Sequence, residues 1–123
     1  MLGARLVEDP FVGPDGRIGH AELAVDEVHF MLSDSYPEAG VVAPEEGRLP
    51  TYAMHLYVPD VDATTSAAER AGASVEIAPA DQFDGRRSAT VVDPFGVRWM
   101  LTTQARRLSE EEYAAARTAF AGS

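Results

Sequence analysis

The sequence contains no cysteine and no lysine, and all ten of its basic residues are arginine. Without cysteine, the chain can form neither a disulfide nor a thiolate site. It has no apolar run long enough to span a bilayer and no basic, apolar leader, so we expect a cytoplasmic protein that does not associate with membranes. Basic charge is also scarce. The net charge of −10 repels phosphate backbones, so we expect no nucleic-acid partner.

The bulk composition is that of one globular domain. The chain has 123 residues, and 46% of them are hydrophobic, which is enough for a single core. The clearest local pattern is SATVVDPFGVRWMLT, residues 88–102, which predicts two strands joined by a turn at Asp93-Pro94-Phe95-Gly96. Pro94 disfavours helix at the residue before it, and Gly96 can adopt a positive φ without cost.

This hairpin has a faint copy earlier in the chain. A shift of 69 residues places Val97–Leu101 on Val28–Leu32, and the same shift places Ala71–Val75 on Leu2–Leu6. One fixed offset serves both matches, which favours an internal repeat of one supersecondary unit.

The remaining elements follow from periodicity, turn residues and caps. We predict strands at residues 4–9, 18–25, 28–33, 51–58, 74–78, 88–92 and 97–101. Helices are predicted at 61–71, capped by Asp60 or Asp62 and ended by Gly72, and at 110–120. The second helix follows a capping box formed by Ser109 and Glu112, and we expect it to dock on the body of the domain. Residues 79–87 are predicted to be a polar loop.

A family resemblance is carried by HLYVPDVDATTSAAERAGASVEIAPADQFDGRRSATVVDPFGVRWMLTT, residues 55–103. This stretch resembles the second half of glyoxalase/bleomycin-resistance proteins, the vicinal oxygen chelate superfamily. GRIGHAELAVDEVHFMLSD and the DQFDGRRS loop resemble its PhnB-like branch. The resemblance covers about residues 2–104 and implies an α+β fold. Paired βαβββ modules would form curved, mostly antiparallel sheets around a cavity, followed by a C-terminal helix.

The resemblance divides the chain into one domain with four parts. Residues 1–33 form a first module that lacks its opening strand and nearly all of its helix, 34–50 form a linker, 51–104 form the second module, and 105–123 carry the C-terminal helix. The incomplete first module leaves one strand edge and one apolar sheet face uncovered. We therefore expect a homodimer in which each chain covers the other's first module and the cavities are lined by both chains.

The resemblance also locates the positions where metal-dependent members hold their ion. His55 stands where the second opening strand supplies a ligand, and Met31 and Met100 stand at the closing-strand positions. Thioether is a poor ligand for hard or borderline divalent ions, and one histidine does not hold such an ion tightly. We therefore expect no catalytic metal and no cofactor.

Four candidates for lining a cavity each have two interpretations. His55 is either a polar group that hydrogen-bonds or protonates a ligand, or a residue retained from the family whose imidazole is hydrogen-bonded to a neighbouring hydroxyl or carbonyl. Met100 and Met31 are either an adaptable apolar lining or plain core filling. Strand alternation puts Arg98 and Met100 on one face; Arg98 either binds a ligand carboxylate or meets a surface acid.

Other candidates depend on the resemblance and the repeat. Family analogy turns Ser88 and Thr90 toward the cavity. His29 shares the face of Met31 and is a secondary candidate. The repeat places His20 and Glu22 on Ala89 and Val91, which predicts that they face the helix side, as an acid–base pair or in structural roles. Trp99 is expected in the core beneath the helix.

Three functions remain open from these residues. The first is a metal-free protein that binds a small molecule, such as an antibiotic or an aromatic metabolite. The second is a lyase, isomerase or dioxygenase of the same superfamily, with a weak metal or acid–base chemistry at His55. The third is a structural subunit whose first module is completed by another chain.

Overall fold

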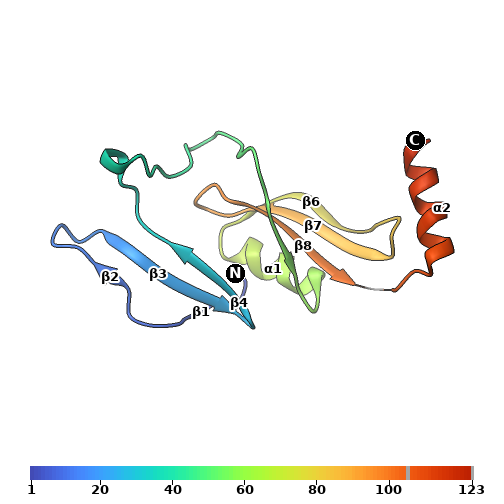
Figure 1. The fold of residues 1–123 in the computed structure, drawn as a ribbon, viewed down its shortest axis with the longest axis horizontal. Helices are drawn as coiled ribbons and strands as arrows, with labels where there is room; N and C mark the ends of the chain where they lie inside the picture. Colours follow the sequence, from blue (N-terminus) through green and yellow to red (C-terminus); the bar gives the residue numbers. More distant parts are fainter. Residues whose placement is uncertain (105, 123) are drawn as a thin grey trace.

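The computed structural model of the chain describes residues 1–104 and 106–122. Positions 105 and 123, the two ends of the expected C-terminal segment, lie outside the described residues. The part described is an α+β fold with two separate four-stranded sheets (Figure 1). The elements in chain order are β1 (Arg5–Leu6), β2 (Phe11–Val12), β3 (Ile18–Val25), β4 (Val28–Leu32), the short 3-10 helix η1 (Pro37–Ala39), β5 (Met54–Tyr57), α1 (Val61–Arg70), β6 (Ser74–Asp81), β7 (Arg86–Val92), β8 (Arg98–Gln104) and α2 (Glu110–Ala121).

The first sheet is built around β3, which pairs antiparallel with β4 on one side and with β1 and β2 on the other. The strand predicted over residues 4–9 was too long, because the ladder between β1 and β3 is interrupted. A continuous ladder would set Asp9 opposite His20, but Phe11 takes that place. Pro10, which has no N–H to donate, lies in the bulge between them.

The second sheet has the strand order β5-β8-β7-β6, with β5 parallel to β8 and the other pairs antiparallel. The predicted turn at residues 93–96 joins β7 to β8. There Gly96 adopts φ +88°, and its N–H donates to the Asp93 carbonyl at 3.1 Å. The polar loop predicted at 79–87 is shorter than expected, because β6 continues through Pro79 to Asp81. Pro79 is tolerated there since β6 is an edge strand with an irregular register.

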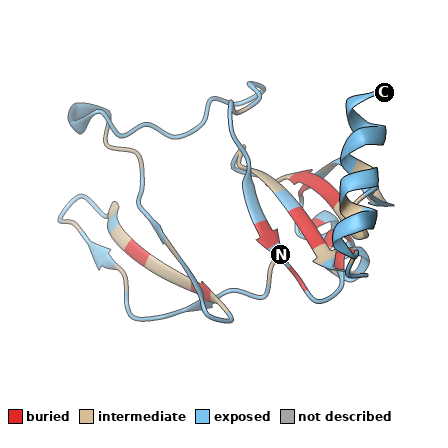
Figure 2. Cartoon of the chain, turned by 45° about the vertical axis from the view of Figure 1, so that its right-hand side comes forward, coloured by how far each residue is buried: buried red, intermediate tan, exposed pale blue. Residues whose placement is uncertain are grey.

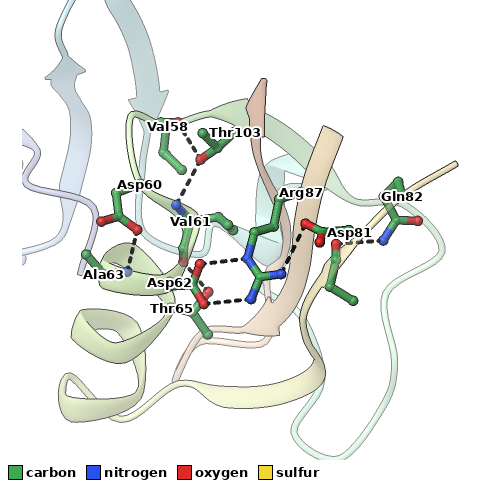
Figure 3. Close-up of polar contacts among 11 residues, drawn as sticks. Val58, Asp60, Val61, Asp62, Ala63, Thr65, Asp81, Gln82, Arg87 and Thr103 are labelled. Atoms are coloured by element: carbon green, nitrogen blue, oxygen red, sulfur yellow. Dashed lines mark hydrogen bonds and ion pairs between the residues drawn. The ribbon is translucent and has the colours of Figure 1, made fainter. Parts of the chain in front are cut away.

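Helix α1 packs against the second sheet and begins at the predicted cap. The Asp60 carboxylate accepts a hydrogen bond from Ala63 N at 3.0 Å, and Gly72 follows the helix with φ +100°. Thr103 fixes the start of the helix to the sheet, because its hydroxyl donates to Val58 O at 2.9 Å and accepts from Val61 N at 2.8 Å (Figure 3).

The hydrophobic core lies between α1 and the second sheet, where most buried positions occur (Figure 2). Its buried members are Leu56, Val58, Val61, Ala68, Ala73, Ala89, Val91 and Leu101. Trp99 is only partly buried at the margin of this core, where it meets Phe30 of the first sheet edge-on at a centroid distance of 5.3 Å. Among the described residues, no helix is both long and apolar enough to cross a membrane.

The hairpin registers correct one placement made from the repeat. Met100 pairs with Thr90 in the second sheet, and its repeat equivalent Met31 pairs with Glu22 in the first. Glu22 therefore corresponds to Thr90, and the prediction that His20 and Glu22 face the helix side was wrong. The turn at Asp26-Glu27 is shorter than the turn of the second hairpin, and a shift of one residue moves a side chain to the opposite face.

Helix α2 begins with the predicted capping box. Ser109 Oγ accepts from Glu112 N at 3.2 Å, and a Glu112 carboxylate oxygen accepts from Ser109 N at 2.8 Å. The expected docking is slight, because none of the helix's described side chains is buried. The helix meets the body through Phe120, whose ring stacks on Phe83 at 5.2 Å.

Candidate small-molecule site on the second sheet

A pocket of about 250 Å³ opens on the face of the second sheet opposite α1. Strands β5, β7 and β8 supply its floor, and the loop between β6 and β7 supplies one wall. Its lining residues are His55, Ile77, Gln82, Phe83, Asp84, Arg86, Ser88, Ala89, Thr90, Met100 and Thr102.

A short chain of hydrogen bonds crosses the pocket floor. The Thr102 hydroxyl lies 2.8 Å from His55 Nε2 and 2.9 Å from Ser88 Oγ. Thr102 is fully buried, whereas the His55 side chain is exposed, so the chain links a buried hydroxyl to an imidazole that a ligand can reach. The three side chains can reverse their donor and acceptor roles together, because each hydroxyl both donates and accepts.

The wall of the pocket is tied to the segment that leads into α2. Arg106 N donates a hydrogen bond to the carbonyl oxygen of Gly85 at 2.9 Å. Gly85 has φ +80°, and a Cβ added at this position would lie 2.6 Å from Arg106 O. Next to it, Arg86 Nε lies 3.2 Å from Asp84 Oδ2, an ion pair that leaves little net charge at the wall. The loop is therefore positioned by residues distant in the sequence.

One aromatic ring, that of Tyr57, stacks on the imidazole of His55. The His55 and Tyr57 rings stack with centroids 5.1 Å apart, and the Arg86 guanidinium carbon lies 5.9 Å from the Tyr57 centroid. Beside them, Met100 is opposite His55 in the parallel β5–β8 register and is 39% exposed. Together these groups offer a flat apolar surface next to hydrogen-bonding atoms.

Four of the residues predicted as ligand-binding line this one pocket: His55, Met100, Ser88 and Thr90. The other three predicted residues lie elsewhere in this chain. Met31 is 70% exposed on the first sheet, and His29 lies beside Glu22, with Nδ1 2.7 Å from Oε1. Arg98 is in an ion pair with Glu76, with Nε 3.0 Å from Oε2, and so meets a surface acid.

Sequence reasoning did not assign a site role to several lining residues. Thr102 is two residues after Met100 on β8, so strand alternation puts both on one face, and its side of the sheet was readable from the sequence. The contributions of Phe83, Asp84 and Arg86 were not, because they depend on the contact between Gly85 and Arg106.

The positions that hold a metal in metal-dependent members do not fit one here. His55 Nε2 is engaged with Thr102, and its neighbour across the ladder is the thioether of Met100. Met31 lies on the other sheet. One imidazole and two thioethers are not a ligand set for a divalent transition metal, so no step of a mechanism passes through a metal at this place.

Comparison with known proteins gives relatives in sequence. The family model described as Glyoxalase/Bleomycin resistance protein/Dioxygenase superfamily matches residues 1–101. The uncharacterized protein Mb0911c of Mycobacterium bovis is 38% identical over 108 residues, which cover 85% of this chain and 70% of that protein. Rv0887c, an uncharacterized protein of Mycobacterium tuberculosis, is equally similar, but the match covers only 63% of its length.

Solved structures share the fold. Protein PA1353 from Pseudomonas aeruginosa has a TM-score of 0.61 and 26% identity, with 84% of this chain and 80% of that chain covered. TioX from Micromonospora sp. ML1 has a TM-score of 0.57 and 26% identity, covering 88% and 82%. A PhnB protein from Bacillus cereus has a TM-score of 0.58 at 16% identity, covering 82% and 80%, and shows likeness of fold alone. With its α+β fold and a family match over most of its length, this chain belongs to the Glyoxalase/Bleomycin resistance protein/Dioxygenase superfamily.

Proposed function

We propose that this protein binds a small aromatic or amphipathic molecule in the pocket of the second sheet, without the help of a metal. The observation that carries the proposal is the hydrogen-bonded chain His55–Thr102–Ser88 beside the exposed side chains of Met100 and Tyr57. Small-molecule sites typically combine an apolar wall with a few polar groups that fix orientation. A ligand would lay its flat apolar part on Met100, which lines the pocket, and direct a hydroxyl, carbonyl or amide to His55, whose ring stacks on Tyr57.

The charges around the pocket favour a neutral or weakly cationic ligand. Arg86 is the basic residue of the lining, and Asp84 pairs with it at 3.2 Å. The protein as a whole carries a net charge of −10, which repels anions. A strongly acidic ligand would therefore have to take Arg86 away from Asp84. Breaking this ion pair would leave the Asp84 carboxylate without its partner at the pocket wall, which costs free energy.

We also propose that the protein is a homodimer whose cavities are shared between chains. The pocket volume of about 250 Å³ lies below the range of about 300–1,000 Å³ that is usual for a drug-sized ligand, so a second surface above the sheet would complete it. The first sheet leaves large apolar side chains exposed: Leu6, Phe11, Val12, Val28, Met31 and Leu32. Pairing of two chains would cover such a surface. A cytoplasmic location stays a prediction, for which cell fractionation is the test.

A thermal-shift screen of chemically diverse small molecules tests the ligand proposal. Compounds with a flat ring and one hydrogen-bonding group should raise the melting temperature, because a ligand that binds only the folded state stabilises it. Two methionines on opposite faces of the second sheet provide matched variants: Met100, 39% exposed in the pocket, and Met54, 37% exposed and paired with Trp99.

Met100→Ala should abolish or reduce the shift, and Met54→Ala should retain it. If no compound stabilises the wild-type protein, or if both variants respond alike to every compound, the proposed ligand site is wrong.

A further inference from the structure

A cluster of histidine and glutamate side chains lies on the first sheet, away from the pocket. Glu8, His20 and Glu22 each offer one ligand atom, and these atoms all lie within 4.8 Å of one another. His20 and Glu22 are two residues apart on β3, so the pleat directs both side chains to one face. The chain therefore concentrates one imidazole and two carboxylates at a single point of the sheet.

Glu8 reaches this point because of the bulge between β1 and β2. Val7 N still donates to Glu22 O at 2.9 Å, and the chain returns to the ladder only at Phe11, opposite His20. The residues between are released from pairing with β3, which brings the carboxylate of Glu8 over the strand. Bulges of this kind redirect side chains and occur beside functional sites.

A second histidine supports the cluster from the neighbouring strand. His29 Nδ1 lies 2.7 Å from Glu22 Oε1, and the Glu22 side chain is only 19% exposed. An imidazole that donates to a carboxylate fixes the orientation of that carboxylate, which is the usual arrangement around a metal ligand. This contact is independent of the Glu8 bulge and points to the same carboxylate.

We propose that Glu8, His20 and Glu22 bind one divalent first-row transition-metal ion, for which Zn²⁺ is the probe. His29 is a positioning residue that acts through Glu22. Mixed imidazole and carboxylate ligands suit zinc and its neighbours, whereas Ca²⁺ and Mg²⁺ prefer oxygen alone. Three protein ligands leave coordination positions open for water or a ligand.

The expectation of a metal-free protein rested on other positions of the chain, none of which belongs to this cluster. The metal site lies on the first sheet and is independent of whether the pocket of the second sheet binds a small molecule. The register of the β3–β4 hairpin is what reveals it, because His20 and Glu22 share their face with His29 and Met31. The site therefore occupies the face of the first sheet that corresponds to the pocket face of the second.

Calorimetric titration of the chelator-treated full chain with ZnCl₂ tests the site. We expect one zinc ion per chain and no comparable binding of MgCl₂ or CaCl₂. His20→Ala and Glu22→Gln should abolish binding, and His29→Ala should weaken it about 10–100-fold, the usual effect of losing an orienting partner.

His55→Ala is the matched control, because it removes the remaining histidine of the chain from the other sheet and should leave the zinc stoichiometry unchanged. Glu8→Gln, in an exposed segment outside the strands, should weaken zinc binding at least about tenfold and keeps the test decisive if a strand variant fails to fold. The proposal is overturned if the wild-type chain binds no zinc, if binding survives in Glu8→Gln and the folded strand variants, or if His55→Ala abolishes it.

Discussion

The Thr102 hydroxyl lies 2.8 Å from His55 Nε2, although 47 residues separate the two along the chain. The contact exists because β5 and β8 are parallel neighbours, and their register places His55 beside Met100 and Tyr57 beside Thr102. Thr102 is fully buried, so its hydroxyl requires a partner inside the protein, and the imidazole supplies it. The same hydrogen bond therefore satisfies a buried group and orients a candidate ligand-binding group.

Thr102→Val should separate the role of this hydroxyl from that of the side-chain volume. We expect a loss of about 1 kcal/mol in the free energy of unfolding, since His55 and Ser88 lose a shared partner but can turn to water. Ligands found by thermal shift should bind more weakly. Thr65→Val is the control, because it removes a buried hydroxyl that donates to Val61 O inside α1 at 2.7 Å. Urea unfolding and ligand titration of both variants check this; equal ligand affinity in the two would contradict it.

Gly85→Ala should loosen the pocket wall. A positive φ costs a residue with a Cβ about 1–2 kcal/mol, and here the Cβ would also lie 2.6 Å from Arg106 O. Gly40, at φ +76°, has no neighbouring atom within 4 Å of where a Cβ would stand, so it isolates the conformational part of this cost. We expect Gly85→Ala to lower the free energy of unfolding by more than Gly40→Ala does, as measured by urea unfolding. Equal losses would mean that the approach of Arg106 is easily relaxed.

The ion pair between α1 and β7 should make stability depend on acid pH. The pKa of Asp62 lies below its ordinary value of 3.8 because its carboxylate accepts hydrogen bonds from Arg87 Nε at 2.8 Å and Nη2 at 3.0 Å (Figure 3). With the folded-state pKa depressed, the stabilisation is fully present above pH 3.8 and is lost as the pH falls through the lower folded value.

Asp62→Asn and Arg87→Gln should each lower stability at about pH 6 and flatten its decline between about pH 4 and pH 2. Because Asp62 is solvent-accessible, the effect should shrink in high salt. The midpoints of urea unfolding of the wild type and both variants, measured at these pH values, test this prediction. A wild-type decline that is unchanged in both variants would assign the acid sensitivity to other carboxylates.

Light scattering coupled to size exclusion should give a mass near twice the chain mass of 13.2 kDa. Leu32→Glu, which places a charge on an exposed apolar position of β4, should shift the protein toward monomer. Phe95→Glu is the control, since Phe95 is 80% exposed at the β7–β8 turn of the other sheet. A well-folded wild-type monomer at micromolar concentration would contradict the proposed dimer.

The sequence predicted best the elements whose signals are local. The bounds of β3 agree with the prediction, the cap at Asp60 and the turn at Gly96 form as expected, and the capping box begins α2. Each depends on residues within a few positions of one another. The shortening of the strand predicted over residues 4–9 could not be foreseen, because it depends on how β1 and β2 pair with a distant strand.

Longer-range geometry explains the remaining differences. A constant shift between the repeats ignores the shorter Asp26-Glu27 turn, and so it turned His20 and Glu22 to the wrong face. The pocket floor was predictable, because alternation and pairing along β7 and β8 decide which side chains share a face. The wall was not, because Gly85 meets Arg106 only in the folded chain.

The most direct test of small-molecule binding is a methyl NMR titration of protein labelled at its four methionines. Compounds selected by thermal shift should move the Met100 methyl resonance in proportion to occupancy and leave that of Met54 unchanged, because the two lie on opposite faces of the second sheet. A simultaneous shift of Met31 would mean that the first sheet contributes to the cavity, as a shared dimeric site predicts. If stabilising compounds leave Met100 unmoved, the pocket of the second sheet is not the binding site.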